Sequence, residues 1–402
     1  PYFFKLINYI TLYKYKNGLY SIRKRGLNMK FTIDKSALLS ALQHVHSVVE
    51  RRNTIPILSN VLIEAKEDGV YLTATDMDIA VIEKIDLKKS EVMQLGTITT
   101  SAQMLYDIVR KLPDNISVEL LSEKNDRLGI KASTSSFALN CLPSEEFPSI
   151  AQEEFNHSFN IDASEMIRLI DKTSFAMSLE ETRYYLNGIY LHAVKDSTND
   201  KLRTVSTDGH RLSRVDMNMP EGVQEIPGVI IPRKTIMEIR KLLEDHTDNI
   251  NLSLSDNKIQ ISFSNVILTS KLLDGTFPDY SRVIPEQNDK TITISNQLLS
   301  EAVDRVSTVS TDKTRAIKIN INKGNLVISA TNPDKGSASE SLEVKYDGEE
   351  VEIGFNSKYV LDVARQIKGK DIIIKLSDSV SPTLVYDKED EDVLFVLMPM
   401  RV

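Results

Sequence analysis

The chain of 402 residues contains one cysteine, six histidines and no apolar run long enough to span a membrane. A single cysteine, Cys141, cannot form an internal disulfide, so a disulfide-stabilised scaffold is excluded and a reducing, cytoplasmic location is predicted. A membrane-spanning helix needs about 18 or more apolar residues, so no contact with the membrane interior is expected. With 41% hydrophobic and 26% charged residues and no low-complexity tract, the chain should form roughly two to four globular domains.

The scarcity of histidine and cysteine also limits the chemistry that the chain can perform. His44 and His46 lie two positions apart on a predicted helix and therefore point in different directions, and the other histidines lack the spacing of metal ligands. The sequence contains no phosphate-binding loop, nucleophile elbow or zinc pattern. We therefore expect no metal and no cofactor. One catalytic alternative stays open: the stretch TVSTDGHRLS at 204–213 could centre a hydrolase on Asp208 and His210.

Residues 1–28 differ from the rest of the chain, because they contain six lysines and arginines and no acidic residue. They lack the uninterrupted apolar core of a signal peptide, and we expect an unstructured extension before a body that starts at Met29. The body holds 43 basic and 57 acidic residues, a net charge of −14. Taken alone, that charge argues against nucleic acid as a partner.

The body repeats one pattern three times. Each copy opens with a short strand and an amphipathic helix, at 31–45, 159–173 and 292–306. Alternating strands follow, the second of which ends in a Thr-Asp or Thr-Asn turn that begins at Thr75, Thr207 or Thr331. A second helix and a last set of strands complete the copy.

The period of about 125 residues predicts an α+β fold made of three tandem copies, with six helices in all. The predicted boundaries fall in polar segments and divide the chain into an extension at 1–28 and domains at 29–153, 154–288 and 289–402. The repeat also gives Asp208 and Gly209 a structural interpretation, because Asp76 and Asn332 occupy the same turn in the other copies. His210, Arg211 and Leu212 have no such counterparts.

The predicted helices are less acidic than the rest of the chain. Together they carry +3 within a body of −14, and the second helix of each copy is the basic one. The six helices are predicted at 36–49, 101–112, 164–178, 233–245, 297–311 and 357–368. Twelve helices of about 10 Å standing in a closed circle would leave a hole of about 28 Å, whereas six would leave only about 9 Å. A DNA duplex is roughly 20 Å across, so two chains could enclose it and one could not.

Several long motifs resemble a known family, the bacterial DNA polymerase III beta subunit or sliding clamp. They are RNTIPILSN at 52, RYYLNGIYL at 183, RTVSTDGHRLS at 203, VIIPRK at 229, TSKLLDGTFPDYSRVIP at 269, IGFNSKYVLDV at 353 and the terminal LMPMRV. The resemblance covers essentially all of 29–402. It implies a head-to-tail homodimeric ring with helices lining the inside and sheets outside, and no catalysis.

The resemblance also implies partners and sites. The ring would encircle double-stranded DNA without reading its sequence and would bind the polymerase III catalytic subunit, the clamp-loader ATPase, and other polymerases and repair proteins through short linear motifs. The partner-peptide pocket would comprise Leu186, Thr207, Gly209, His210, Arg211, Leu212, Pro278, Val283, Val396, Met398, Met400 and Arg401. Within it, apolar side chains would form an adaptable cleft, and Arg211 would offer orienting hydrogen bonds.

The implied DNA contacts are Arg52, Tyr184 and Tyr185, and the basic second helix adds Arg233 and Lys234. Tyr184 and Tyr185 could equally be core residues of a strand. Two contact positions depart from the family pattern: Gln103 replaces an arginine and Glu180 a glutamine, which should weaken the grip on DNA. At the implied dimer interface, Phe137 and Leu139 would face Thr308 and Val309 of the other subunit.

Overall fold

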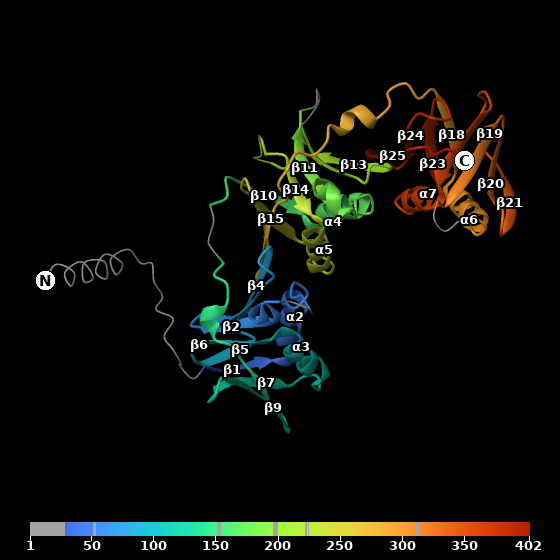
Figure 1. The fold of residues 1–402 in the computed structure, drawn as a ribbon. Coiled ribbons are helices and arrows are strands. Elements are labelled where there is room, and N and C mark those ends of the chain that lie inside the picture. Colours follow the sequence, from blue (N-terminus) through green and yellow to red (C-terminus); the bar gives the residue numbers. More distant parts are fainter. Residues whose placement is uncertain are drawn as a thin grey trace. The chain divides into compact units, whose positions relative to one another are not determined.

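The computed structural model describes residues 29–50, 54–150, 154–195, 200–221, 223, 225–310 and 314–402. The chain divides into two compact units, Pro1–Ala151 and Gln152–Val402. The six expected helices are all present, and strands fill most of the described sequence between them (Figure 1). The three-copy α+β fold predicted from the repeat is therefore confirmed.

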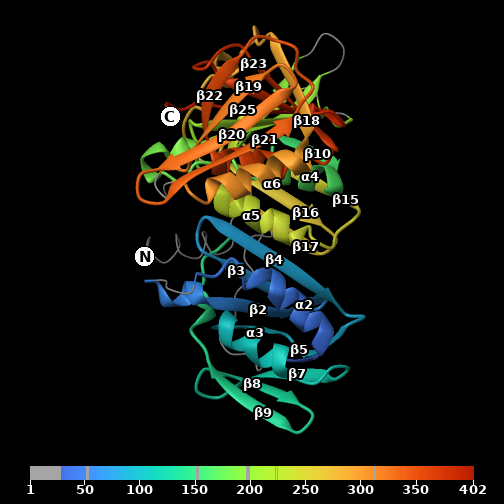
Figure 2. The ribbon, with the colours of Figure 1, turned by 90° about the vertical axis from the view of Figure 1, so that its right-hand side faces the viewer.

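The first unit contains one copy of the repeat. In chain order its elements are β1 (Lys30–Asp34), α2 (Lys35–Val45), β2 (Asn60–Lys66), β3 (Gly69–Thr75), β4 (Ile79–Asp86), β5 (Ser90–Gln94), β6 (Gly96–Ser101), α3 (Ala102–Lys111), β7 (Ser117–Glu123), β8 (Arg127–Ala132) and β9 (Ser135–Asn140). Antiparallel sheets run in the orders β5-β1-β7-β8-β9 and β4-β3-β2-β6. Helices α2 and α3 lie side by side (Figure 2).

The second unit contains the other two copies. The second copy comprises β10 (His157–Asp162), α4 (Ala163–Ser174), β11 (Gly188–Val194), β12 (Lys201–Thr207), β13 (Arg211–Asn218), β14 (Val229–Pro232), α5 (Arg233–Leu242), β15 (Asn249–Leu254), β16 (Lys258–Phe263) and β17 (Val266–Lys271). The third comprises β18 (Lys290–Ser295), α6 (Asn296–Ser307), β19 (Ala316–Asn322), β20 (Asn325–Asn332), β21 (Gly336–Glu343), β22 (Val351–Asn356), α7 (Ser357–Ala364), β23 (Asp371–Leu376), β24 (Thr383–Asp387) and β25 (Asp390–Leu397).

The last two copies share one continuous sheet of eight strands, in the order β14-β11-β12-β13-β25-β24-β23-β18. Strands β13 and β25 join the copies, with Leu212 opposite Val396 and Val215 opposite Val393. This pairing accounts for the absence of a division between units near the predicted boundary at 288/289. The third copy closes with a separate sheet in the order β21-β20-β19-β22.

Side chains cap several of the helices. Ser101, Asp162, Ser295 and Asn356 each accept a hydrogen bond from a backbone N–H in the first turn that follows. The six helices end one to four residues before the predicted ends. At the end of α7, Gln366 N–H donates to the Val363 carbonyl at 2.9 Å, which closes the helix in a tighter final turn before the predicted end at 368.

Candidate functional site

The Thr-Asp turn has the same hydrogen bonds in the first two copies. Thr207 Oγ1 donates to the Arg211 carbonyl, and Asp208 Oδ1 accepts from the backbone N–H groups of His210 and Arg211 at 2.9 and 3.0 Å. In the first copy, Thr75 and Asp76 make the corresponding bonds. In the third copy Asn332 Oδ1 accepts from Asp334 N–H. The structural interpretation of Asp208 as a turn-forming residue is confirmed.

The residue after this aspartate has a left-handed backbone in both copies, with φ of 88° at Gly209 and 82° at Met77. Asp208 also has its second carboxylate oxygen occupied, because Oδ2 accepts from Arg211 Nε at 3.1 Å. Both oxygens therefore serve the turn and its arginine. An orienting aspartate for a catalytic His210 would need an oxygen that is available to the imidazole, so this geometry gives the hydrolase alternative no support.

The apolar floor of the predicted pocket is assembled from three distant segments. Leu186, Leu212 and Val396 belong to one buried cluster and are at most 4% exposed. The β13–β25 ladder places Leu212 directly opposite Val396. Leu186 ends the 3-10 helix η3 (Glu181–Leu186), which precedes β11. Residues more than 200 positions apart thus meet in one cluster.

Exposed side chains surround this floor. Met398 N–H donates to the His210 carbonyl at 2.9 Å, so these two residues, both exposed, lie beside each other. Val283 is 40% exposed on the 3-10 helix η4 (Tyr280–Val283), and Pro278 is exposed just before it. Tyr280 and Ile284 pack against the apolar cluster. An apolar floor with exposed rims of different origin is the form expected of a site that binds an apolar peptide.

Arg211 is buried and is hydrogen-bonded to three other parts of the chain. Its guanidinium donates to Asp208 Oδ2, to Asp362 Oδ2 at 2.6 Å and to the Phe175 carbonyl at 2.6 Å, and the residue is only 7% exposed. It also lies over the Tyr359 ring, 4.5 Å from the centroid. These three bonds use three of the five N–H donors of the guanidinium, so two donors remain for a bound peptide. The bond to Asp362 also fixes Arg211 to α7.

The residues that hold Arg211 could not be identified from the sequence. Asp362 and Tyr359 lie on α7, and Phe175 follows α4. Tyr359 also stacks with His210, with ring centroids 6.1 Å apart. Their only sequence signal was the motif around 353–363, and nothing in its spacing indicated a contact with a turn about 150 residues earlier.

Helix η4 is attached to the sheet through His192. His192 Nε2 lies 3.0 Å from Tyr280 Oη, and Arg203 Nη1 donates to the same oxygen at 3.2 Å. Burial lowers the pKa of His192 below its usual value, an effect that the hydrogen bond to the Ala193 carbonyl only partly opposes. The neutral imidazole is thus the form that holds η4, and with it Val283, in place.

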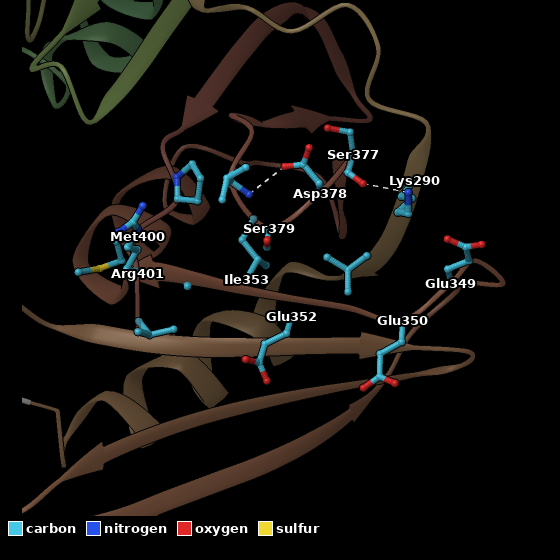
Figure 3. Close-up of a pocket in the computed structure, with 15 residues that line it drawn as sticks. Lys290, Glu349, Glu350, Glu352, Ile353, Ser377, Asp378, Ser379, Met400 and Arg401 are labelled. Atoms are coloured by element: carbon cyan, nitrogen blue, oxygen red, sulfur yellow. Dashed lines mark hydrogen bonds between the residues drawn. The ribbon is translucent and has the colours of Figure 1, made fainter.

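The tail residues lie away from the apolar cluster. Met400 N–H donates to the Gly354 carbonyl of β22 at 2.9 Å, and Met400 and Arg401 line a groove beside that strand (Figure 3). The structure therefore brings Leu186, Leu212 and Val396 together and sets His210 beside Met398. Met400 and Arg401 belong to an adjoining surface.

Arg52, one of the predicted DNA contacts, lies outside the described residues. Tyr184 and Tyr185 lie in helix η3 and not in a strand, so their interpretation as core strand residues is wrong. Tyr184 is 50% exposed, whereas Tyr185 packs against the apolar cluster. Gln103 donates to Asp107 at 2.9 Å within α3, and Glu180 pairs with Arg183 at 2.7 Å. Arg233 is exposed at the start of α5, and Lys234 follows it.

Several arginines of the basic helices are paired with aspartates. Arg110 lies 3.4 Å from Asp107, Arg240 2.7 Å from Asp171 and Arg365 3.0 Å from Asp362. Lys111, Lys241, Lys358 and Lys368 are exposed. A surface of this kind offers modest, unpatterned positive charge and no array of side chains suited to reading base edges.

The predicted dimer contacts lie at two separate places. Phe137 and Leu139 are on β9, the edge strand of its sheet, where Phe137 is half-buried and Leu139 is 8% exposed. Thr308 and Val309 directly follow α6. An edge strand has unpaired backbone groups that can extend a sheet into another chain.

Within the described ranges, no group of three or more histidine, cysteine, aspartate or glutamate side chains could hold a metal ion. In the same residues no helix is long and apolar enough to cross a membrane. The fold and the site together define a class of protein: a tandem array of three like α+β domains in which exposed side chains from distant segments flank one apolar cluster.

Comparison with known proteins identifies this class. Family models of the DNA polymerase III beta subunit match its N-terminal domain at 29–151, its central domain at 160–279 and its C-terminal domain at 281–401. The chain therefore belongs to the DNA polymerase III beta subunit family and acts as a sliding clamp, a replication processivity factor with no catalysis of its own. As a clamp it binds DNA and a polymerase.

Individual relatives agree along their whole length. The beta sliding clamp of Caulobacter vibrioides strain NA1000 is 49% identical over 375 residues, which cover 93% of this chain and all of the relative. That of Pseudomonas aeruginosa is 39% identical over 374 residues, again covering 93% of this chain and all of the relative. The crystal structure of the Bartonella birtlesii sliding clamp bound to griselimycin has a TM-score of 0.90 and 48% identity, covering 94% of this chain and all of that one.

Proposed function

We propose that two copies of this chain form a closed ring around double-stranded DNA and tether replication and repair proteins to it. The polymerase III catalytic subunit, the clamp-loader ATPase and other polymerases would bind through short linear motifs. The observation that carries the peptide site is the meeting of Leu186, Leu212 and Val396 in one buried floor beside the exposed Met398 and His210. Family membership supports the ring and the encircled DNA.

Within this proposal the domains remain 29–153, 154–288 and 289–402, preceded by the extension at 1–28, and the protein acts in the cytoplasm. The pocket comprises the floor with Thr207, Gly209, His210, Pro278, Val283 and Met398 around it, and Met400 and Arg401 extend it on the adjoining surface. Arg211 belongs to the pocket as the buried support of its wall. DNA contacts are Arg52, Gln103, Tyr184, Tyr185, Arg233 and Lys234, and the subunits meet through Phe137 and Leu139 against Thr308 and Val309.

A related clamp binds griselimycin, and we propose that this chain binds the same compound in the pocket, so griselimycin binding tests the pocket. Met398→Ala removes an exposed rim side chain, and Leu186→Ala with Met398→Ala removes part of the floor as well. The double variant should lose about 2 kcal/mol or more of binding free energy, roughly 30-fold in Kd, by calorimetry. Leu87→Ala, at a side chain that is 49% exposed in the first unit, is the matched control. Equal affinity of all variants would refute the pocket.

Release from circular DNA tests the ring. A ring loaded onto a closed circle by a clamp-loader ATPase should remain there at salt concentrations that dissociate it from linear duplex, because topology holds it. Cutting the circle should then release it. Arg233→Ala with Lys234→Ala should weaken the linear complex without shortening retention on the circle, and Lys195→Ala, an exposed lysine outside the proposed contacts, is the control. Equal release before and after cutting would refute encirclement.

A further inference from the structure

Strand β22 has one free edge. It is the last strand in the order β21-β20-β19-β22, so only one of its sides pairs with another strand of the sheet. The Gly354 carbonyl points to the other side, where it accepts from Met400 N–H. Outward-facing residues alternate along an antiparallel edge, so the N–H and carbonyl of Glu352 point outward as well. Among the described residues, neither group has a backbone partner on that side.

The corresponding edges of the other two copies are covered by an extended segment of the chain. Ile230 of β14 lies three residues before its helix, as Gly354 does, and its carbonyl accepts from Leu273 N–H at 2.9 Å. Thr99 of β6, also three residues before its helix, donates through Oγ1 to the Leu142 carbonyl at 2.6 Å. These covering segments continue to Phe147 and Phe277, both nearly buried. In two of the three copies, this edge of the sheet thus binds an extended segment of the chain.

In the third copy Met400 makes the equivalent bond to Gly354, and the edge of β22 beyond that bond borders a groove of about 910 Å³. Figure 3 shows Met400 and Arg401 at one end and Lys290 and Glu349 at the other, with Asp378 across from β22. A strand has a cross-section of about 4.8 Å by 10 Å and rises about 3.3 Å per residue, so the groove has room for roughly six residues. Its volume and its exposed edge therefore fit one short strand.

The charges along this edge indicate what kind of segment it would bind. Glu352 of β22 and Glu350, which directly precedes this strand, both project away from the loop at 377–379 (Figure 3). Glu350 accepts from Asn320 at 2.8 Å, and Glu352 pairs with Lys318 at 2.9 Å, so both carboxylates lie on the sheet surface. Side chains of an added strand on this face would lie beside these glutamates. Opposite charges at cross-strand positions stabilise a pair, and like charges destabilise it.

We propose that the free edge of β22 binds an extended basic segment of a partner protein, which adds to the sheet as an antiparallel strand. Lysine or arginine at alternate positions of the segment would meet Glu350 and Glu352, and its backbone would pair with the N–H and carbonyl of Glu352. Strand addition of this kind obtains its affinity from main-chain hydrogen bonds and its specificity from alternate side chains.

The groove adjoins the proposed peptide pocket, because Met400 and Arg401 line the groove and Met398 is on the rim of the pocket. A partner whose apolar motif occupies the pocket would thus place a flanking segment on β22. This last step rests on the proposed function, whereas strand addition to β22 does not.

The test uses a fluorescein-labelled heptapeptide, acetyl-Thr-Lys-Val-Lys-Val-Lys-Thr-amide, titrated with the full chain by fluorescence polarisation. A second peptide with glutamate in place of each lysine is the control ligand. The lysine peptide should bind, and the glutamate peptide should bind at least about 10-fold more weakly. Glu350→Lys with Glu352→Lys should reverse this preference. The matched double variant Glu286→Lys with Glu391→Lys changes two exposed glutamates outside the groove and should leave it unchanged.

A backbone variant separates strand addition from simple charge attraction. Glu352→Pro removes an N–H that faces away from β19, so the ladder of the sheet remains while the new strand loses a donor. It should weaken the lysine peptide at least about 5-fold, more than Glu352→Gln does, with circular dichroism confirming the fold. Equal binding by both peptides, or undiminished binding by Glu352→Pro, would overturn the proposal. Leu186→Ala with Met398→Ala should bind the lysine peptide normally, which keeps a failure of the pocket distinguishable from a failure of the groove.

Discussion

The pair formed by Arg211 and Asp362 should contribute far more to stability than the ion pairs on the protein surface. The two side chains are 8% and 14% exposed, and Nη1 lies 2.6 Å from Oδ2. Removal of one partner from a buried pair leaves an uncompensated charge and typically costs about 3–5 kcal/mol. Arg211→Met leaves Asp208 without its cation, whereas Asp362 keeps the exposed Arg365, so the lower end of this range, about 3 kcal/mol, is expected. Asp362→Asn keeps the shape and leaves Asp208 in place, so about 2 kcal/mol is expected.

A double-mutant cycle measured by urea unfolding, followed by far-UV circular dichroism, checks this prediction. Because the two residues contact each other, the double variant Arg211→Met with Asp362→Asn should lose at least about 1 kcal/mol less than the sum of the single losses. The exposed pair Arg110 and Asp107 provides the comparison, with an expected coupling of about 0.2–0.5 kcal/mol. A coupling for the buried pair no larger than that of the exposed pair would refute this account of the pocket wall.

Four further predictions follow from particular groups. Below pH 6.5 the unfolded chain should take up a proton at His192 before the folded chain does, because burial lowers the folded pKa. Stability in urea should therefore fall from pH 7.5 to 5.5, and His192→Gln should flatten that slope. Burial raises the pKa of Cys141 to about 11. At pH 8 iodoacetamide should therefore modify Cys141 about 100-fold more slowly than it modifies a thiol of pKa 9.0. Equal rates would contradict the burial of Cys141. In Gly354→Ala the added Cβ would collide with the Met400 carbonyl oxygen, so carboxypeptidase should remove Val402 and Arg401 faster than from the unaltered chain. Light scattering should give twice the 45.3 kDa of the chain, and Phe137→Lys should give the single-chain mass.

The features that could be predicted from the sequence depend on neighbours along the chain. Helical periodicity located the six helices, and the recurrence of Thr75, Thr207 and Thr331 located the equivalent strand ends. The turn chemistry of Asp208 followed from its residue type and its counterparts. Helix ends were less accurate, because the last turn of α7 responds to packing.

Features that depend on distant contacts could not be predicted from patterns within the chain. Arg211 is typical of an exposed ligand-binding residue in a polar turn, yet its charge is neutralised by Asp362, 151 positions later in the sequence. The pairing of β13 with β25 could not be predicted from hydrophobic periodicity either, since any alternating strand could have paired with β13. The convergence of Leu186, Leu212 and Val396 was predicted through the family resemblance and not from spacing.

The Thr-Asp turn has a consequence for how the three copies could diverge. Its geometry is fixed by its own threonine and aspartate, or by asparagine in the third copy, and the first two copies share this bonding although different residues follow the turn. New residues can therefore replace those after the turn without loss of the bonds that form it. Mutations at the positions after the turn can thus change the properties of one copy while its fold is retained. In the second copy that freedom is used by the exposed His210 and by Arg211 and Leu212, which are buried beneath it and support the proposed pocket.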